Sequence, residues 1–113
     1  MDSVESYVRR HSLDNLLSAD LLGALRPLRR LPGELILRAG DPVRDLLFFV
    51  EGRIKIYSIL ANGQSILAAI YKPFDVLGEV ELFNSKRYTL SVEALTETVC
   101  LGLPVAAVRK NAG

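Results

Sequence analysis

The residues best suited to bind a ligand lie in one short segment, residues 76–83, in which Gly78 is followed by Glu79. Glycine lets the backbone approach another group closely, and the first amide groups of a helical turn have no partner within the helix. Such a helix start can hold an anion, typically a phosphate, whereas the Glu79 carboxylate would accept a hydrogen bond from a ligand hydroxyl. The alternative is structural, with Gly78 in a turn and Glu79 as an ordinary acid at a helix start.

Metal and nucleophile chemistry is limited by the residue types present. His11 and Cys100 are the single histidine and the single cysteine, so no closed zinc site, iron–sulfur cluster or histidine-rich cupin-type metal site can be built. No serine–histidine–aspartate or cysteine–histidine set can be assembled either. The sequence therefore predicts no metal site and no enzyme. Cys100 lies in an apolar run and is expected to be a buried, inert thiol, and His11 to be a surface or packing residue.

Size and composition predict a single domain over residues 1–113. Half of the residues are hydrophobic and 24% are charged, a balance typical of a globular domain. No apolar run approaches the roughly 20 residues of a membrane-spanning helix, and the N-terminus does not fit a signal peptide, so a cytoplasmic protein without a membrane partner is expected. The net charge of +1 predicts no general attraction to nucleic acid. Arg26, Arg29 and Arg30 are interpreted as a solvated helix face, with a phosphate-binding patch as the alternative.

Helices are predicted at both ends of the chain. In a lead-in over residues 1–31, Asp2 or Ser3 can cap a first helix and Ser18 a second, which Pro27 should kink or end. The period changes at residue 34, and residues 34–103 consist of short β-prone runs punctuated by glycine. Residues 104–113 are predicted to begin a C-terminal helix, with Pro104 in its first turn.

Asn62-Gly63 is the clearest turn signal, because it separates two strand-like runs and so predicts a hairpin. The return strand runs from Ser65 to Tyr71. Its residues Ile66, Ala68 and Ile70 are expected to share one face and to supply apolar walls to a ligand pocket. Six to eight short strands predict a mainly β fold, a jelly roll or double-stranded β-helix with N-terminal helices and a short C-terminal helix.

Several motifs follow one another in a characteristic order: Gly40-Asp41 after a strand, the run from Phe48 to Tyr57, Asn62-Gly63, Gly78-Glu79, and Ser91-Val92-Glu93-Ala94. Over roughly residues 13–110, this order resembles the cyclic-nucleotide-binding sensor domain of transcription regulators in the catabolite activator protein (Crp/Fnr) family. Residues 60–63, 78–82 and 100–104 are also similar to the YeiL-type branch of that family. The resemblance implies a bacterial ligand-sensing domain on a jelly roll.

The resemblance also implies a ligand site. In family members that bind cyclic AMP, a short helix after Gly-Glu forms a phosphate-binding cassette, the glutamate accepts a hydrogen bond from the ribose, and a later arginine pairs with the phosphate. With residues 91–94 as the anchor, the arginine position falls on Tyr88 and the hydroxyl position on Thr89. Arg87 is adjacent, but neighbouring residues of a strand point to opposite faces, so its side chain would point away from the pocket. A shift of register in the short loop at residues 84–86 would turn Arg87 back into the pocket. The implied ligand-binding set is Gly78, Glu79, Val80, Arg87, Tyr88, Thr89, Ile66, Ala68 and Ile70.

Tyr88 cannot neutralise a phosphate, so the sequence disfavours cyclic AMP bound in the usual family mode. The remaining alternatives are another small organic effector, a nucleotide in an altered register, and a roll without ligand, in which Glu79 pairs with an arginine and Tyr88 closes the pocket.

The resemblance further implies partners outside the chain. In the family, a long dimerisation helix and a winged helix-turn-helix follow the sensor, and no helix-turn-helix is found in the 113 residues, which end at Gly113. DNA binding and homodimer formation are therefore expected of a parent protein, and the chain is expected to be a trimmed fragment or a truncated product. The other alternative is the regulatory domain of a kinase, exchange factor or channel, which uses the same fold.

Overall fold

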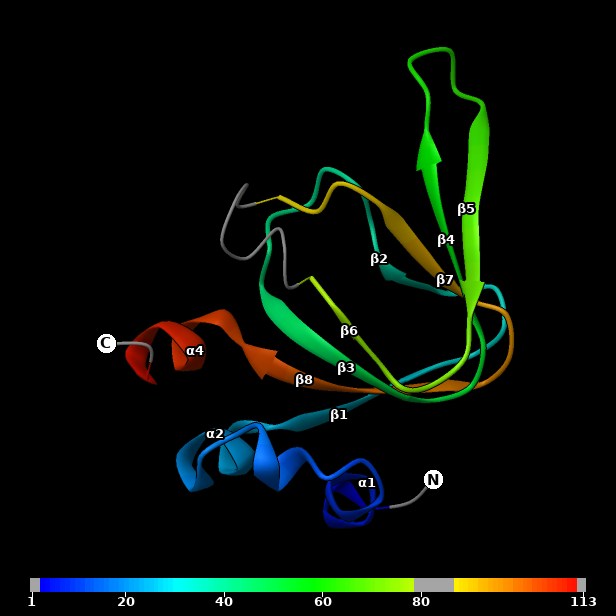
Figure 1. The fold of residues 1–113 in the computed structure, drawn as a ribbon. Coiled ribbons are helices and arrows are strands. Elements are labelled where there is room, and N and C mark those ends of the chain that lie inside the picture. Colours follow the sequence, from blue (N-terminus) through cyan, green and yellow to red (C-terminus); the bar gives the residue numbers. More distant parts are fainter. Residues whose placement is uncertain (1–2, 79–86, 112–113) are drawn as a thin grey trace.

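Two four-stranded antiparallel sheets form the body of the protein (Figure 1). The computed structural model describes residues 3–78 and 87–111. One sheet, sheet A, has the strand order β1-β8-β3-β6, and the other, sheet B, has the order β2-β7-β4-β5. Most consecutive strands lie in opposite sheets, and strands that are distant in sequence pair within each sheet, as in a jelly roll, so the predicted fold class is confirmed. The strands are β1 (Arg26–Arg30), β2 (Leu35–Leu37), β3 (Asp45–Glu51), β4 (Ile54–Ile59), β5 (Ser65–Tyr71), β6 (Asp75–Leu77), β7 (Ser91–Ala94) and β8 (Thr98–Pro104).

The central strands of sheet A, β3 and β8, separate two hydrophobic clusters. Phe48 and Leu101 contribute to an outer cluster beneath the helices, whereas Phe49 and Cys100 contribute to an inner cluster between the sheets. Successive residues of a strand point to opposite faces, so a strand covered on both faces needs an almost unbroken apolar run. The sequences DLLFFVE and TVCLGLP meet that requirement.

The helical lead-in packs on the outer face of sheet A (Figure 1). It consists of α1 (Val4–Arg10), the short 3-10 helix η1 (Leu13–Asn15) and α2 (Ala19–Ala24). The predicted caps are confirmed, because the Ser3 hydroxyl accepts a hydrogen bond from the Ser6 amide and the Ser18 hydroxyl accepts one from the Leu21 amide. After β8, α4 (Val105–Asn111) forms as predicted, but Pro104 ends β8 and does not lie in the first turn of the helix. None of the helices in the described ranges has the length and apolar character needed to span a membrane.

The prediction of helix up to residue 31 was wrong at its C-terminal end. Helix α2 stops at Ala24, and residues 26–30 form β1, which pairs with β8 alone. Pro27 disfavours helical backbone at the residue before it and lacks an N–H donor, which an edge strand tolerates. The arginines of this segment therefore lie on a strand and not on a helix face.

The β4–β5 hairpin confirms the prediction for Asn62-Gly63 and corrects the one for the return strand. Gly63 has a φ of 85° at the tip, and the hairpin projects beyond the rest of the roll (Figure 1). The register shifts between Ile56 and Tyr57, so Ala68 has no partner on β4. Such a bulge reverses the alternation of faces: Ile66 lies opposite Ser58, and Ile70 lies opposite Lys55. The expectation of one shared face for Ile66, Ala68 and Ile70 was therefore wrong.

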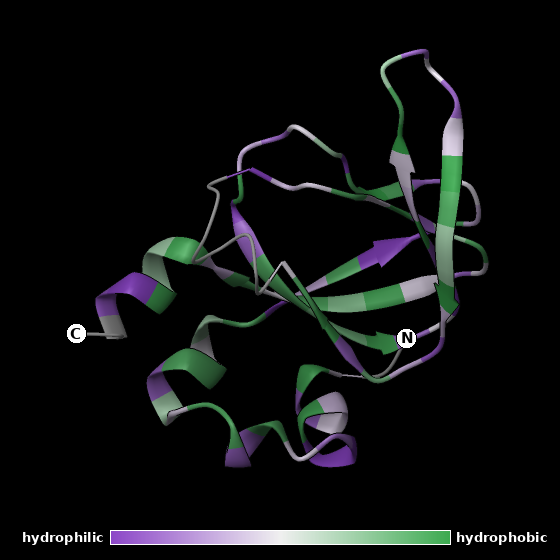
Figure 2. Ribbon diagram, turned by 45° about the horizontal axis from the view of Figure 1, so that its top comes forward, coloured by the Kyte–Doolittle hydropathy of each residue, from purple (hydrophilic) through white to green (hydrophobic). Residues whose placement is uncertain are grey.

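Strand β5 is the exposed edge of sheet B. Hydrophobic residues continue along it (Figure 2), yet Ile66 and Ile70 are 48% and 60% exposed. Ala68 is exposed as well. The described elements place no helix against this strand, so its three predicted wall residues contribute nothing to the two hydrophobic clusters.

Candidate functional site

Tyr88 lies at the centre of the predicted site and is buried. Its hydroxyl donates a hydrogen bond of 2.9 Å to the Asp45 carbonyl and accepts longer ones of 3.4 Å from the amides of Arg44 and Asp45. Its ring lies over Gly78, where a Cβ atom would come within 3.2 Å of the Tyr88 Cε1 atom. Gly78, with a φ of 89°, thus leaves room for the tyrosine ring. The glycine was predicted to let a ligand approach closely, but the group that approaches it is a side chain of the protein.

The backbone around Tyr88 is tied to the loop between β2 and β3. The Gly40 amide donates to the Tyr88 carbonyl at 2.8 Å, and the Tyr88 amide donates to the Asp41 carbonyl at 3.0 Å. Arg87 is exposed, and its guanidinium donates to the Gly40 carbonyl at 2.7 Å. These bonds hold residues 87 and 88 in one register, with Tyr88 inward and Arg87 on the loop. Thr89 is exposed next to them.

The other cassette residues of the prediction, Glu79 and Val80, lie outside the described residues, as does the helical turn expected over residues 78–83. The alternative pairing of Glu79 with Arg87 lies outside them for the same reason.

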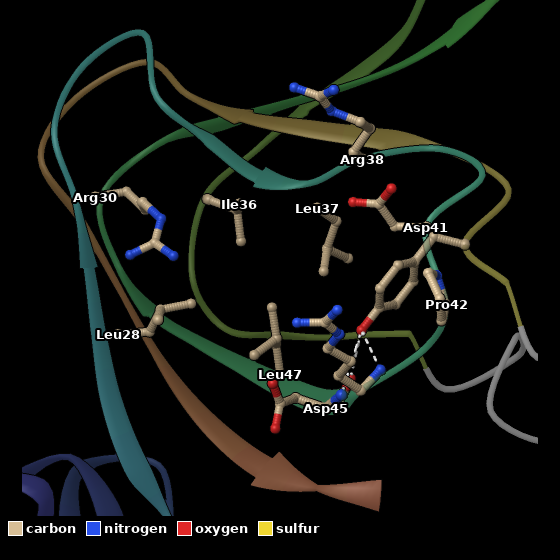
Figure 3. A pocket seen from close by; sticks show the side chains of 11 residues that line it. Leu28, Arg30, Ile36, Leu37, Arg38, Asp41, Pro42, Asp45 and Leu47 are labelled. Carbon is tan, nitrogen blue, oxygen red and sulfur yellow. Dashed lines mark hydrogen bonds between the residues drawn. The ribbon is translucent and has the colours of Figure 1, made fainter.

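A cavity of about 400 Å³ opens between the two sheets next to Tyr88 (Figure 3). A volume of this size suits a small organic molecule. Its floor is apolar, while its polar groups come from three arginines and two aspartates. The lining comprises Leu28, Arg30, Ile36, Leu37, Arg38, Asp41, Pro42, Arg44, Asp45, Leu47 and Tyr88. Neither Gly78 nor any of the predicted β5 wall residues lines it.

Arg30 is the cavity residue for which the interpretation from sequence was wrong. It lies two residues after Leu28, which packs in the inner cluster, and so it shares the inward face of β1. Figure 3 shows its guanidinium directed into the space between Leu28 and Ile36. The neighbouring Arg29 points outward and forms an ion pair of 2.8 Å with Glu97. The alternation Arg26, Leu28, Arg30 beside Pro27 was the available signal, but it was assigned to a helix.

Among the described residues, the charged side chains that line the cavity form no ion pairs with one another. In the described ranges, the ion pairs join Arg29 to Glu97 and Lys55 to Glu93, and both lie outside the cavity. Arg30 donates from Nε to the Leu35 carbonyl at 3.2 Å and from its NH1 nitrogen to the Arg29 carbonyl at 2.9 Å. These two bonds orient the guanidinium and leave its other donors facing the cavity.

Cys100 and His11 take the structural roles predicted for them. Burial raises the pKa of the Cys100 thiol to about 12, although the Arg30 guanidinium acts in the opposite direction. A thiol with this pKa is a poor nucleophile at neutral pH. His11 stacks on Phe74 with ring centroids 5.0 Å apart, and its Nε2 atom lies 3.3 Å from the Val50 carbonyl oxygen. Three or more metal-binding side chains do not gather anywhere in residues 3–78 and 87–111.

Comparison with curated proteins finds relatives that are longer than this chain. The regulatory protein YeiL of Escherichia coli O157:H7 is 29% identical over 90 residues, which cover 80% of this chain and 41% of YeiL. The acetyltransferase Pat of Mycolicibacterium smegmatis is 33% identical over 70 residues, which cover 62% of this chain and 21% of Pat. The chain thus spans between about a fifth and two fifths of these relatives.

A solved structure with the same fold supports the architecture described above. The crystal structure of DNR from Pseudomonas aeruginosa superposes with a TM-score of 0.81 at 18% identity, covering 99% of this chain and 53% of DNR. The jelly roll and its helical lead-in are therefore shared with a protein of different sequence. Residues 28–111 match the family model of the cyclic nucleotide-binding domain, and the chain belongs to that family.

Proposed function

We propose that this chain is the ligand-sensing domain of a bacterial transcription regulator of the Crp/Fnr type, and that its effector is not a cyclic nucleotide held in the usual family mode. The similarity to YeiL and to DNR supports the first part. The effector would bind in the roll and change DNA binding by another part of a longer, cytoplasmic, homodimeric protein. The domain itself would act by binding and not by catalysis.

The observation that carries the second part is the placement of Tyr88. The inward position that the resemblance assigns to a phosphate-pairing arginine holds a phenol whose hydroxyl is bonded to the Asp45 carbonyl. A phenol offers no positive charge to a phosphate, and its hydroxyl is already used within the protein. The ring also occupies the space above Gly78 that a ligand would enter.

Calorimetry with cyclic AMP and cyclic GMP tests this proposal on the wild-type chain and on Tyr88→Arg, Tyr88→Phe and Glu79→Gln. We expect no binding to the wild type, Tyr88→Phe or Glu79→Gln, and measurable nucleotide binding to Tyr88→Arg. Tight binding of cyclic AMP by the wild type would contradict the proposal. Absence of binding to Tyr88→Arg would favour the closed roll over a cassette that lacks only its arginine.

The second test concerns DNA. We expect the 113-residue chain to show only weak, salt-sensitive association in a gel-shift assay, because its net charge is near zero. A sequence-specific complex at physiological salt would contradict the assignment of DNA binding to another part of the protein.

A second candidate function is the regulatory domain of an enzyme, which the similarity to the acetyltransferase Pat supports. In that case the same cavity would control catalysis by another part of the protein, and the binding experiments above would give the same result.

A further inference from the structure

The cavity between the sheets is lined by an arginine of β1. Arg30 projects inward from β1, with its neighbours on that face, Leu28 and Cys100, in the inner hydrophobic cluster. Placing a cation among apolar side chains costs free energy unless a partner compensates it. No carboxylate of the described residues lies within ion-pair distance of Arg30. The half-buried Arg30 guanidinium also lowers the pKa of the Cys100 thiol, against the larger effect of burial.

The guanidinium of Arg30 is oriented before any ligand arrives. Two of its five N–H donors are bound by the carbonyls of Arg29 and Leu35. An arginine fixed in this way loses little side-chain freedom on binding and can engage two oxygens of one carboxylate or phosphate. Arg44 lines the same cavity and adds a second guanidinium. Arg38 lines it too, but Figure 3 shows its guanidinium directed out of the cavity.

The other residues that line the cavity indicate the chemical character of the rest of the ligand. Leu28, Ile36, Leu37 and Leu47 provide an apolar floor. A small apolar body bearing one anionic group fits a surface of this kind.

We propose that this cavity binds a small organic anion, with a carboxylate or phosphate on Arg30, additional positive charge from Arg44, and an apolar body on the leucine and isoleucine floor. This inference rests on the proposed sensing function and assigns it a ligand class. The cations of this site lie on β1 and on the loop before β3, and not at the cassette position that Tyr88 occupies.

Titration calorimetry and amide chemical-shift mapping with benzoate, phenyl phosphate and the uncharged benzyl alcohol test the proposal on the whole chain. We expect benzoate or phenyl phosphate to bind, benzyl alcohol to bind much more weakly, and the shifted amides to include β1 and β2. Arg30→Gln should weaken binding by roughly tenfold to a hundredfold, because hydrogen bonds to charged groups contribute most. Arg44 is exposed, so Arg44→Gln should fold normally and also weaken binding.

Arg29→Gln is the matched control. It removes the same charge from the same strand, but on the outward face, and should leave the affinity unchanged. No binding of either anion at about 10 mM would overturn the proposal. Equal losses for Arg29→Gln and Arg30→Gln would also overturn it. The two proposals fail separately, because wild-type binding of cyclic AMP contradicts the role assigned to Tyr88 whatever the anions do.

Discussion

Sheet A and sheet B have the same number of strands but very different surroundings. Sheet A lies between the helices on one side and sheet B on the other, and its residues enter both hydrophobic clusters. Sheet B faces the protein interior on one side only, and its edge strand β5 is largely exposed. Stability should therefore be concentrated in sheet A, whereas sheet B can change its outer face and its hairpin at little cost. The candidate anion cavity lies where the two sheets meet, with lining from β1, β2 and β3.

The largest difference is expected between a buried residue of sheet A and an exposed residue of the edge strand of sheet B. Phe49 is fully buried in β3, and Phe49→Ala should lower the free energy of unfolding by about 3–5 kcal/mol, through lost burial and a cavity. Ile70→Ala on β5 removes a side chain that is 60% exposed and should change it by about 0.5 kcal/mol or less. Urea denaturation measures both. Similar losses for the two variants would refute the contrast between the sheets.

Two glycines with positive φ sharpen the comparison. A Cβ atom at Gly52 would fall 2.5 Å from Thr98 Oγ1 and 2.6 Å from the Glu97 carbonyl, whereas nothing lies within 4 Å of one at Gly63. Gly63→Ala should cost about 1 kcal/mol from backbone conformation alone, and Gly52→Ala about 3 kcal/mol because overpacking is added. Thermal unfolding of the two variants checks the ranking. Equal costs would show that sheet A can move away from residue 52.

The burial of Cys100 in sheet A predicts that the free energy of unfolding depends on pH. Burial raises the pKa of Cys100 from 9.0 to about 12. Between these values the unfolded chain releases a proton that the folded chain retains, so the thiol's contribution to stability is present below pH 9 and declines as pH rises toward 12. The slope contributed by this group approaches about 1.4 kcal/mol per pH unit. Cys100→Ala should remove this part of the alkaline slope in denaturation series, and an unchanged slope would contradict the prediction.

The contact between the sheets at Tyr88 should contribute less. Tyr88→Phe removes the hydroxyl that donates to the Asp45 carbonyl and should lower stability by about 1 kcal/mol while leaving the fold unchanged. Tyr71→Phe on the exposed edge strand is the matched control and should have no measurable effect. Chemical denaturation of both variants measures the free energy of unfolding. If Tyr88→Phe leaves it unchanged, the ring packing alone would fix the loop between β2 and β3.

The smallest effect is expected on the outer face of sheet B. Lys55 and Glu93 form a cross-strand pair with a separation of 3.5 Å. A double-mutant cycle with Lys55→Met and Glu93→Gln should give a coupling energy of about 1 kcal/mol or less, because the pair is partly solvated. The coupling should weaken further in high salt. A larger coupling would show that this face is more shielded than its exposure indicates.

Local signals in the sequence were sufficient for much of the fold. The serine caps, the hairpin at Asn62-Gly63 and the β-prone runs of residues 34–103 each depend on residues close together in the chain, and each was predicted. The same local character explains the buried thiol of Cys100, since its own neighbours are apolar. Composition alone was enough to exclude clustered cysteine or histidine sites.

Tertiary pairing decided the features that shape the site. Strand β1 exists because β8 offers it an edge, the bulge at Ala68 depends on its register with β4, and Tyr88 turns inward because the loop around Gly40 and Asp45 binds it there. These contacts join residues far apart in the chain, so no local pattern specifies them. The inward guanidinium of Arg30 follows from the same cause: β8 places β1 with one face toward sheet B, and a residue that reads as surface charge in the sequence becomes part of a cavity.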